Sequence, residues 1–250
     1  MSPLRALVLR TAGTNCDGET AEALRLAGAE PAVLHINQIL AAPATLDDFR
    51  LLVIPGGFSY GDDVAAGKIL ANELRFKLGD ALKKFVDSGK RIIGICNGFQ
   101  VLVKTGFLPG GTAGAQTVTL AANDSGQFQC HWVTLHREAS ACRWLNATDT
   151  AWDLPIAHGE GKFIAQDPAT LAALEKKGQI VFRYKGVNPN GSQNAIAGLC
   201  NAEGNVIGLM PHPERHMLRQ QHPQWSRQTP ASATPVGLQF FKAAVSGANG

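Results

Sequence analysis

The sequence predicts an α/β protein with an open, mostly parallel sheet that has helices on both faces. Two observations lead to this prediction: short, almost wholly apolar segments recur along the first half of the chain, and segments with helical spacing separate them. Strands covered on both faces read as continuous apolar runs. With 250 residues, 45% of them hydrophobic, the chain can bury one substantial core, so we expect a single domain spanning 1–250.

Predicted strands and helices alternate through the first half. Strands are predicted at four apolar or β-branched runs, which are 4–9, 32–36, 51–54 and 91–95. Residues 19–27 and 69–86 carry apolar side chains at helical spacing, and we expect Gly79 to break the second helix. Such alternation is typical of parallel strands joined by crossover helices.

The second half of the chain is less regular. Its predicted elements are strands at 128–135, 179–183, 195–199 and 206–210, and a closing helix at 237–245. A short Gly-containing stretch separates 195–199 from 206–210, which predicts a hairpin. Residues 219–235 are rich in Gln, Pro, Ser and Thr, so we expect a flexible loop there.

Composition argues against several classes of function. The net charge is only +3 and the basic residues are scattered, whereas nucleic-acid-binding proteins concentrate them on one face. No run approaches the ~20 apolar residues that a membrane helix needs. The five cysteines are dispersed without a CxxC pair, which is unlike a disulfide framework or a structural metal site. We therefore expect a cytoplasmic protein that binds no nucleic acid, membrane or metal.

The most informative segment is the turn around Cys96. It places Cys96 between Gly94 and Gly98, after a predicted buried strand and before a helix. This is the sulfur counterpart of the G-x-S-x-G nucleophile elbow. A sharp turn pushes the nucleophile outward and leaves room only for Gly on either side, while the helix start favours the thiolate. The pattern predicts that Cys96 is a nucleophile.

A free cysteine is more often a small buried apolar residue than a nucleophile. For Cys96 the flanking glycines and the strand-to-helix position outweigh that interpretation. For the other four cysteines we keep the interpretation as small buried apolar residues. For Cys16 and Asp17, a contact with a partner and a purely structural role both stay open.

A reactive thiol needs a base, and His212 followed by Pro213 and Glu214 supplies the pattern. Residues i and i+2 of an extended segment point the same way, so the Glu214 carboxylate can orient the His212 imidazole. The alternative is a surface histidine beside a solvated acid. Together with Cys96, the catalytic interpretation is favoured.

Donors for a developing oxyanion are expected at Gly56, Gly57 and Phe58 and at the backbone of Asn97. The first three residues directly follow a predicted parallel strand, at the sheet edge where open α/β folds place their sites. A glycine pair after a strand is otherwise an ordinary turn.

These residues make the chain resemble the class I (triad) glutamine amidotransferases. The resemblance covers nearly the whole chain and rests on five segments: GTNCD (13–17), PGGFSYGDD (55–63), GICNGFQ (94–100), NPNGS (188–192) and GLMPHPERH (208–216). It implies a flavodoxin-like fold of that class, a Cys96–His212–Glu214 triad and a thioester intermediate. It also implies that Gln100 contacts the glutamine substrate.

The resemblance further implies a glutaminase subunit of a larger complex. Its ammonia would pass to a separate synthetase subunit that uses ATP and magnesium to convert formylglycinamide ribonucleotide to the amidine in purine biosynthesis. A small bridging subunit is also expected. The chain has no GxxxxGK[ST] loop, which fits with ATP binding to the partner and no cofactor here.

Three alternatives stay open at this point. The chain could be a glutaminase subunit for another acceptor, a stand-alone cysteine amidohydrolase, or a catalytically silent subunit. Two positions also depart from the family pattern, since Ala12 precedes GTNCD where Pro is expected, and His131 stands where Arg is expected. Neither position touches the proposed triad, and both bear on the contact with a partner.

Overall fold

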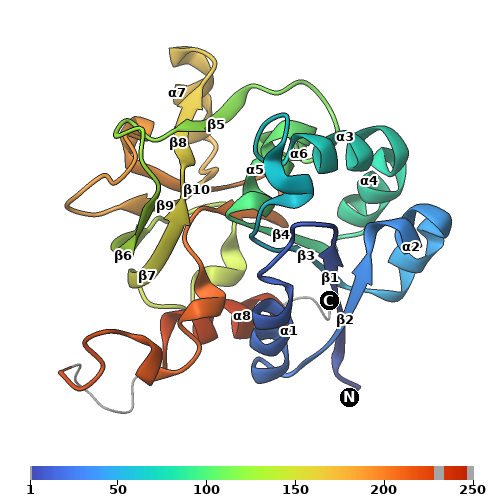
Figure 1. Cartoon of the computed structure of the whole chain (residues 1–250), viewed down its shortest axis with the longest axis horizontal. Helices are drawn as coiled ribbons and strands as arrows, with labels where there is room; N and C mark the ends of the chain where they lie inside the picture. Colours follow the sequence, from blue (N-terminus) through green and yellow to red (C-terminus); the bar gives the residue numbers. More distant parts are fainter. Residues whose placement is uncertain (1, 228–233, 247–250) are drawn as a thin grey trace.

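The computed structural model describes residues 2–227 and 234–246, which form one large sheet with helices against it and a smaller sheet beside it (Figure 1). The strand order of the large sheet is β2-β1-β3-β4-β11-β10-β9-β6-β7. Its strands are β1 (Leu4–Arg10), β2 (Ala29–His35), β3 (Leu51–Ile54), β4 (Arg91–Ile95), β6 (Gln129–Arg137), β7 (Ala151–His158), β9 (Ile180–Tyr184), β10 (Ile196–Cys200) and β11 (Val206–Leu209). The small sheet pairs β5 (Val118–Ala122) with β8 (Glu160–Ala165).

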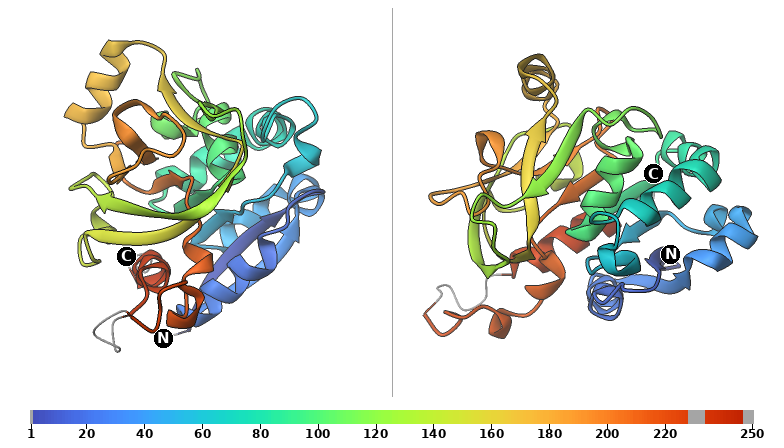
Figure 2. Two further views of the ribbon diagram at one scale, coloured as in Figure 1. Left: turned by 60° about the vertical axis from the view of Figure 1, so that its left-hand side comes forward. Right: turned by 45° about the horizontal axis from the view of Figure 1, so that its top comes forward.

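The helices fill the connections between these strands. They are α1 (Asp17–Leu26), α2 (Ile36–Ala41), α3 (Lys68–Lys77), α4 (Gly79–Asp87), α5 (Asn97–Thr105), α6 (Phe107–Gly110), α7 (Pro168–Lys176) and α8 (Val236–Ser246). Figure 2 shows α7 standing away from the large sheet, on the side of the small one. Among the described residues, no helix has the length and apolar character needed to span a bilayer.

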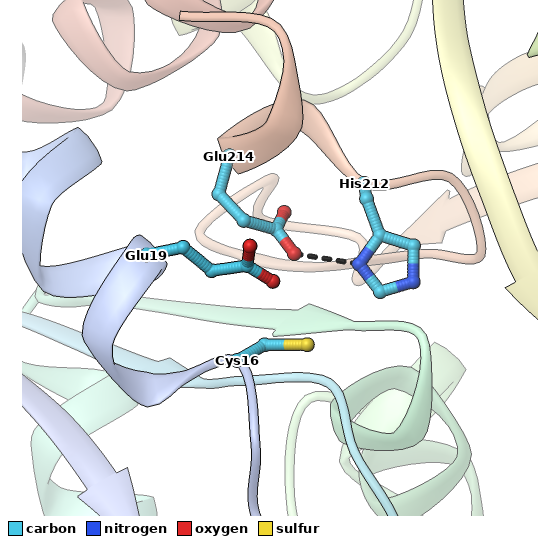
Figure 3. A group of neighbouring side chains, drawn as sticks. All are labelled: Cys16, Glu19, His212 and Glu214. Carbon is cyan, nitrogen blue, oxygen red and sulfur yellow. Dashed lines mark hydrogen bonds and ion pairs between the residues drawn. The ribbon is translucent and has the colours of Figure 1, made fainter.

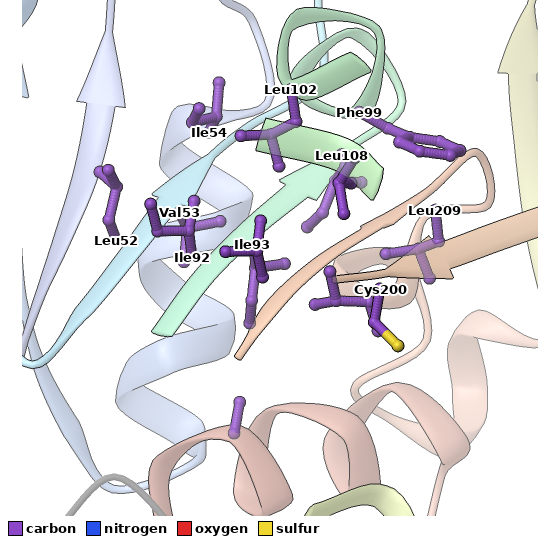
Figure 4. Packing of buried hydrophobic residues seen from close by; sticks show 14 of the residues in the cluster. Leu52, Val53, Ile54, Ile92, Ile93, Phe99, Leu102, Leu108, Cys200 and Leu209 are labelled. Carbon is purple, nitrogen blue, oxygen red and sulfur yellow. The ribbon is translucent and has the colours of Figure 1, made fainter. Parts of the chain in front are cut away.

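The strands β2, β1, β3, β4 and β11 pair in parallel, and every residue of β3, β4 and β11 is buried. Helices α1 and α8 pack together on one face, while α5 and the adjoining α3 cover the other. Figure 4 shows Leu102 of α5 on one side of these strands, with α8 on the other side. The predicted α/β fold is therefore confirmed, and the continuous apolar runs reflect burial on both faces.

From β11 to β7 the pairing is antiparallel. The hairpin of β10 and β11 was predicted, but β5, β7, β8 and α7 were not. Strand β7 buries alternate residues only and contains Pro155, while Leu174 is the one buried residue of α7. Neither segment presents a continuous apolar run or a broad apolar stripe, so their positions depend on tertiary packing.

Several predicted boundaries change in the structure, and two of the changes have a clear local cause. The strand predicted at 32–36 begins earlier, at Ala29, and ends at His35. It ends there because the His35 side chain accepts a hydrogen bond from the Asn37 N–H and so starts helix α2 at Ile36. The helix predicted at 69–86 is divided at Leu78 into α3 and α4, next to the expected break at Gly79. In the segment 219–235, a short 3-10 helix occupies Arg219–Gln221. Residues 228–233 lie outside the described residues, so flexibility there stays a prediction.

Candidate active site

Cys96 occupies a strained turn between β4 and α5. Its backbone has φ 50° and ψ −105°, a region that a residue with a side chain rarely adopts. Such a conformation costs on the order of 1–3 kcal/mol and persists only where the surroundings enforce it. Here the Cys96 N–H donates to the Leu209 carbonyl oxygen at 2.8 Å, and its carbonyl accepts from the first turn of α5. The turn is the predicted nucleophile elbow.

The glycines on either side of the elbow permit two close backbone contacts. A Cβ on Gly98 would lie 1.9 Å from the Ile54 carbonyl oxygen, and a Cβ on Gly94 would lie 2.6 Å from the Gly98 carbonyl oxygen. Both distances are far below contact, and in both the opposing atom is backbone. Gly94 and Gly98 therefore let α5 start directly against the ends of β3 and β4.

His212 and Glu214 form the predicted pair. The His212 Nδ1 lies 2.6 Å from Glu214 Oε1, and both side chains are almost completely buried. Because the carboxylate accepts, Nδ1 carries the proton and Nε2 is left for another partner; within the described residues Nε2 has none. Burial alone would lower the pKa of His212, but the charges of Glu214 and Cys96 outweigh it and raise this pKa well above its ordinary value.

Strand order brings Cys96 and His212 together. Strand β4 lies between β3 and β11, with Ile95 paired to Leu209, so the residues that follow all three strands emerge at one sheet edge. Gly56, two residues after β3, lies between the catalytic groups: a Cβ there would be 2.8 Å from His212 Cε1 and 3.5 Å from Cys96 Cβ. The missing side chain of Gly56 makes room for the imidazole.

The oxyanion donors differ in part from the prediction. Within the described residues, the N–H groups of Gly57 and Asn97 have no acceptor. The Phe58 N–H instead donates to the Gly13 carbonyl oxygen at 2.9 Å. It is not free to hold an oxyanion, so Phe58 is removed from the expected donors, and Gly57 and Asn97 stay candidates for this role. Gly57 has φ 136°, which is open to glycine.

A cavity of about 240 Å³ opens over the nucleophile. Its lining includes Cys96, Gly57, Phe58 and Gln100 among the predicted residues. The amide of Gln100 is part of the wall, because it donates to the Glu160 carbonyl oxygen at 2.6 Å and accepts from Asn97 at 3.0 Å. A larger hollow of about 500 Å³ near Gly110 contains no triad residue, so chemistry rather than size identifies the site.

The opposite wall was missed by sequence reasoning. It consists of Phe128 and of residues 157–160, which end β7 and begin β8. The Cys96 thiol lies 3.6 Å from the Ala157 carbonyl oxygen. The only signal was the glycine pair in the HGEG sequence (158–161), which resembles any surface turn.

His158 in this wall is held in one protonation state. Its Nδ1 lies 3.1 Å from Asn123 Oδ1, and the Asn123 amide nitrogen donates to two carbonyl oxygens, so Oδ1 is the acceptor. The proton of a neutral His158 ring is therefore on Nδ1. Burial and the nearby charge of His212 lower the pKa of His158 to about 4. His158 is neutral at physiological pH.

Cys16 and Glu19 lie beside the His212–Glu214 pair (Figure 3). One ligand atom from each of these four residues lies within 4.8 Å of the others, so their types and spacing could hold a metal ion. However, the Arg215 guanidinium already donates to Cys16 Sγ at 3.2 Å and pairs with Glu19 at 2.9 Å. This positive charge already balances the Cys16 sulfur and the Glu19 carboxylate, as a bound cation would. It also links α1 to the segment that carries His212 and Glu214.

The NPNGS segment supports the cavity wall from behind. Asn190 donates to the Gly161 carbonyl oxygen at 2.8 Å, and Ser192 Oγ accepts from the Phe163 N–H at 2.9 Å. These bonds hold the beginning of β8, next to Glu160. The segment therefore has a defined structural role beyond turn formation.

A strained cysteine elbow with a buried histidine–carboxylate pair and free backbone donors defines a cysteine-dependent amide-hydrolysing site. Residues 3–246 match the family model of the CobB/CobQ-like glutamine amidotransferase domain, so the chain belongs to the glutamine amidotransferases. The resemblance inferred from the five sequence segments is confirmed.

The relatives place the chain more narrowly, among the PurQ subunits of phosphoribosylformylglycinamidine synthase. The subunit from Dehalococcoides mccartyi is 45% identical, covering 98% of both chains, and that from Treponema denticola is 42% identical, covering 96% of this chain and 97% of its own. A chain in the structure of PurLQS from Thermotoga maritima is 35% identical with a TM-score of 0.76 and 98% coverage of both chains. A glutamine amidotransferase from Methylobacillus flagellatus, 17% identical with a TM-score of 0.55, shares the fold over 99% of this chain and 94% of its own.

Proposed function

We propose that the chain hydrolyses glutamine to glutamate and ammonia and passes the ammonia to a synthetase subunit that makes formylglycinamidine ribonucleotide. The observation that supports this most strongly is the Cys96 elbow beside the buried His212–Glu214 pair, in a chain 45% identical to a PurQ subunit. The cavity of about 240 Å³ over Cys96 suits a ligand the size of one amino acid.

The chemistry follows from the positions of the groups. The Cys96 thiolate attacks the side-chain amide carbon of glutamine, and the N–H groups of Gly57 and Asn97 hold the oxyanion. Each such donor stabilises the transition state by about 3 kcal/mol. His212, as an imidazolium stabilised by Glu214, protonates the departing ammonia. It then activates the water that hydrolyses the glutamyl thioester.

The ammonia is consumed by a partner. Exposed apolar side chains line the cavity: Phe58 is 48% exposed and Phe128 is 53% exposed. Exposed apolar groups around an active site favour a covering protein surface. We assign that surface to the synthetase subunit, which binds ATP and magnesium, and we expect a small bridging subunit in the same complex. This chain itself needs no cofactor, and we place it in the cytoplasm, where its five free thiols stay reduced.

Glutamate release from glutamine tests this function. We would compare the wild type, Cys96→Ala and the control Cys130→Ala, each with and without the synthetase, ATP and formylglycinamide ribonucleotide. We expect activity that needs Cys96 and rises strongly with the complete mixture, and no effect at the exposed Cys130. Cys96-dependent activity that ignores the partner would support a stand-alone amidohydrolase. Activity with a different synthetase would support another acceptor, and none in the complete mixture would indicate a silent subunit.

A further inference from the structure

A second thiol, that of Cys16, lies near the nucleophile, beside Gly56 and the His212 ring. An ideal Cβ on Gly56 would be 3.2 Å from Cys16 Sγ and 3.5 Å from Cys96 Cβ. Gly56 contributes no side-chain atom, so both cysteine side chains approach the same point beside it. Sequence reasoning left the role of Cys16 open, and the glutaminase mechanism does not use it.

The imidazole of His212 joins the two thiols. Cys16 Sγ lies within 4.8 Å of a ring nitrogen of His212, and the charge of Cys96 acts on the same ring. Cys16 is 1% exposed, and burial raises the pKa of its thiol, so it stays protonated in the resting protein. Cys96, in contrast, lines the open cavity. A small oxidant in the cavity therefore reaches Cys96 first, whereas Cys16 is buried behind it.

We propose that Cys16 and Cys96 form an oxidative modification site, in which Cys16 resolves a peroxide-oxidised Cys96 as a reversible disulfide. The Cys96 thiolate attacks hydrogen peroxide, forming an S–O bond and breaking the O–O bond, and the His212 imidazolium gives its proton to the departing hydroxide. The products are a sulfenic acid and water, and the His212 ring, now neutral, can accept a proton. Cys16 gives its proton to His212, and its thiolate attacks the Cys96 sulfur. The S–S bond forms as the S–O bond breaks, and the departing hydroxide takes the proton from His212. Overall, two thiols and one peroxide give one disulfide and two waters.

This reaction stops oxidation at a recoverable stage. A sulfenic acid without a resolving thiol proceeds to sulfinic acid, which is irreversible for most proteins, whereas a dithiol reduces a disulfide by exchange. Arg215 is suited to assist, because its guanidinium lies 3.2 Å from Cys16 Sγ and stabilises the attacking thiolate. The glutaminase would be switched off during oxidation and restored afterwards.

The product itself is the test. The reduced full-length chain is exposed to a few equivalents of hydrogen peroxide, alkylated, digested without reduction and analysed by mass spectrometry. We expect a linked pair of peptides containing Cys16 and Cys96, two daltons lighter than the separate thiol peptides, that disappears with dithiothreitol. A linkage between any other pair, or no linkage while Cys96 gains oxygen, would overturn the proposal. This readout needs no glutamine or partner, so it is independent of the glutaminase assay.

Two matched variants sharpen the result. In Cys16→Ser, we expect peroxide to carry Cys96 to sulfinic acid, a gain of 32 daltons, and dithiothreitol to recover less than a tenth of its thiol. The control Cys130→Ser, altered at an exposed cysteine of β6, should behave like the wild type. Cys16→Ala provides a second variant if the serine disturbs folding, which circular dichroism would reveal. Equal recovery in the wild type and both Cys16 variants would contradict a resolving role.

Discussion

Replacing Gly98 by Ala tests the contact on which the elbow depends. The added Cβ would lie 1.9 Å from the Ile54 carbonyl oxygen and 2.7 Å from its carbonyl carbon. Neither backbone atom can rotate away, so the start of α5 must move from the end of β3 by roughly 1.5 Å to restore an ordinary contact. Cys96 and the Asn97 N–H belong to the part that moves, whereas Gly57 belongs to the part that stays.

Two consequences of different size follow from this displacement. Overpacking of a buried contact costs about 1–3 kcal/mol of stability. A misplacement of about 1 Å between reacting groups costs on the order of 100-fold in rate. We therefore expect Gly98→Ala to fold with a free energy of unfolding lower by about 2 kcal/mol, and to lose about 100-fold in partner-dependent glutamate release.

Gly18→Ala is the matched control, since Gly18 is also the second residue of a helix. A Cβ on Gly18 meets no atom within 4 Å, so this variant should keep its activity and gain about 0.5–1 kcal/mol from helix propensity. Urea unfolding and the glutamate assay measure both quantities. Activity of Gly98→Ala within a factor of two of the wild type would refute the argument that this contact sets the catalytic geometry.

Two further predictions concern the titrating groups. Glu214→Gln removes the charge that holds His212 protonated, and the new amide can donate to Nδ1 and select the wrong tautomer. We therefore expect glutamate release to fall roughly 10²–10⁴-fold. A loss below tenfold, or an equal loss in the control Glu19→Gln, would contradict this. His158 has a pKa of about 4 when folded against 6.5 when unfolded, so below pH 6.5 the unfolded chain binds a proton that the folded chain does not, and stability falls as the pH falls towards 4. His158→Gln should therefore reduce the difference in unfolding free energy between pH 7 and pH 5 by about 2 kcal/mol. Urea titrations at the two pH values measure this difference, and an unchanged difference would count against a neutral buried ring.

The sequence by itself determined the local parts of this protein. Continuous apolar runs predicted β3 and β4 because both faces of those strands are buried, and the glycines around Cys96 predicted the elbow because only glycine fits so close to backbone. The His-Pro-Glu segment predicted the pair that lies 2.6 Å apart, although the extended geometry expected for it holds only at His212, because Pro213–Arg215 form a short 3-10 helix. Each of these signals depends on neighbours within a few positions of the chain.

Tertiary structure alone decided which groups meet. The place of β4 between β3 and β11 joins Cys96 to His212, which are distant in sequence. In the loop between β1 and α1, the Gly13 carbonyl oxygen accepts the Phe58 N–H, so Phe58 is not an oxyanion donor. The same loop places Cys16 behind the nucleophile. Residues 157–160 close the cavity from an antiparallel strand that buries only alternate residues. Such contacts depend on strand order and loop packing over long separations, and no local periodicity encodes them.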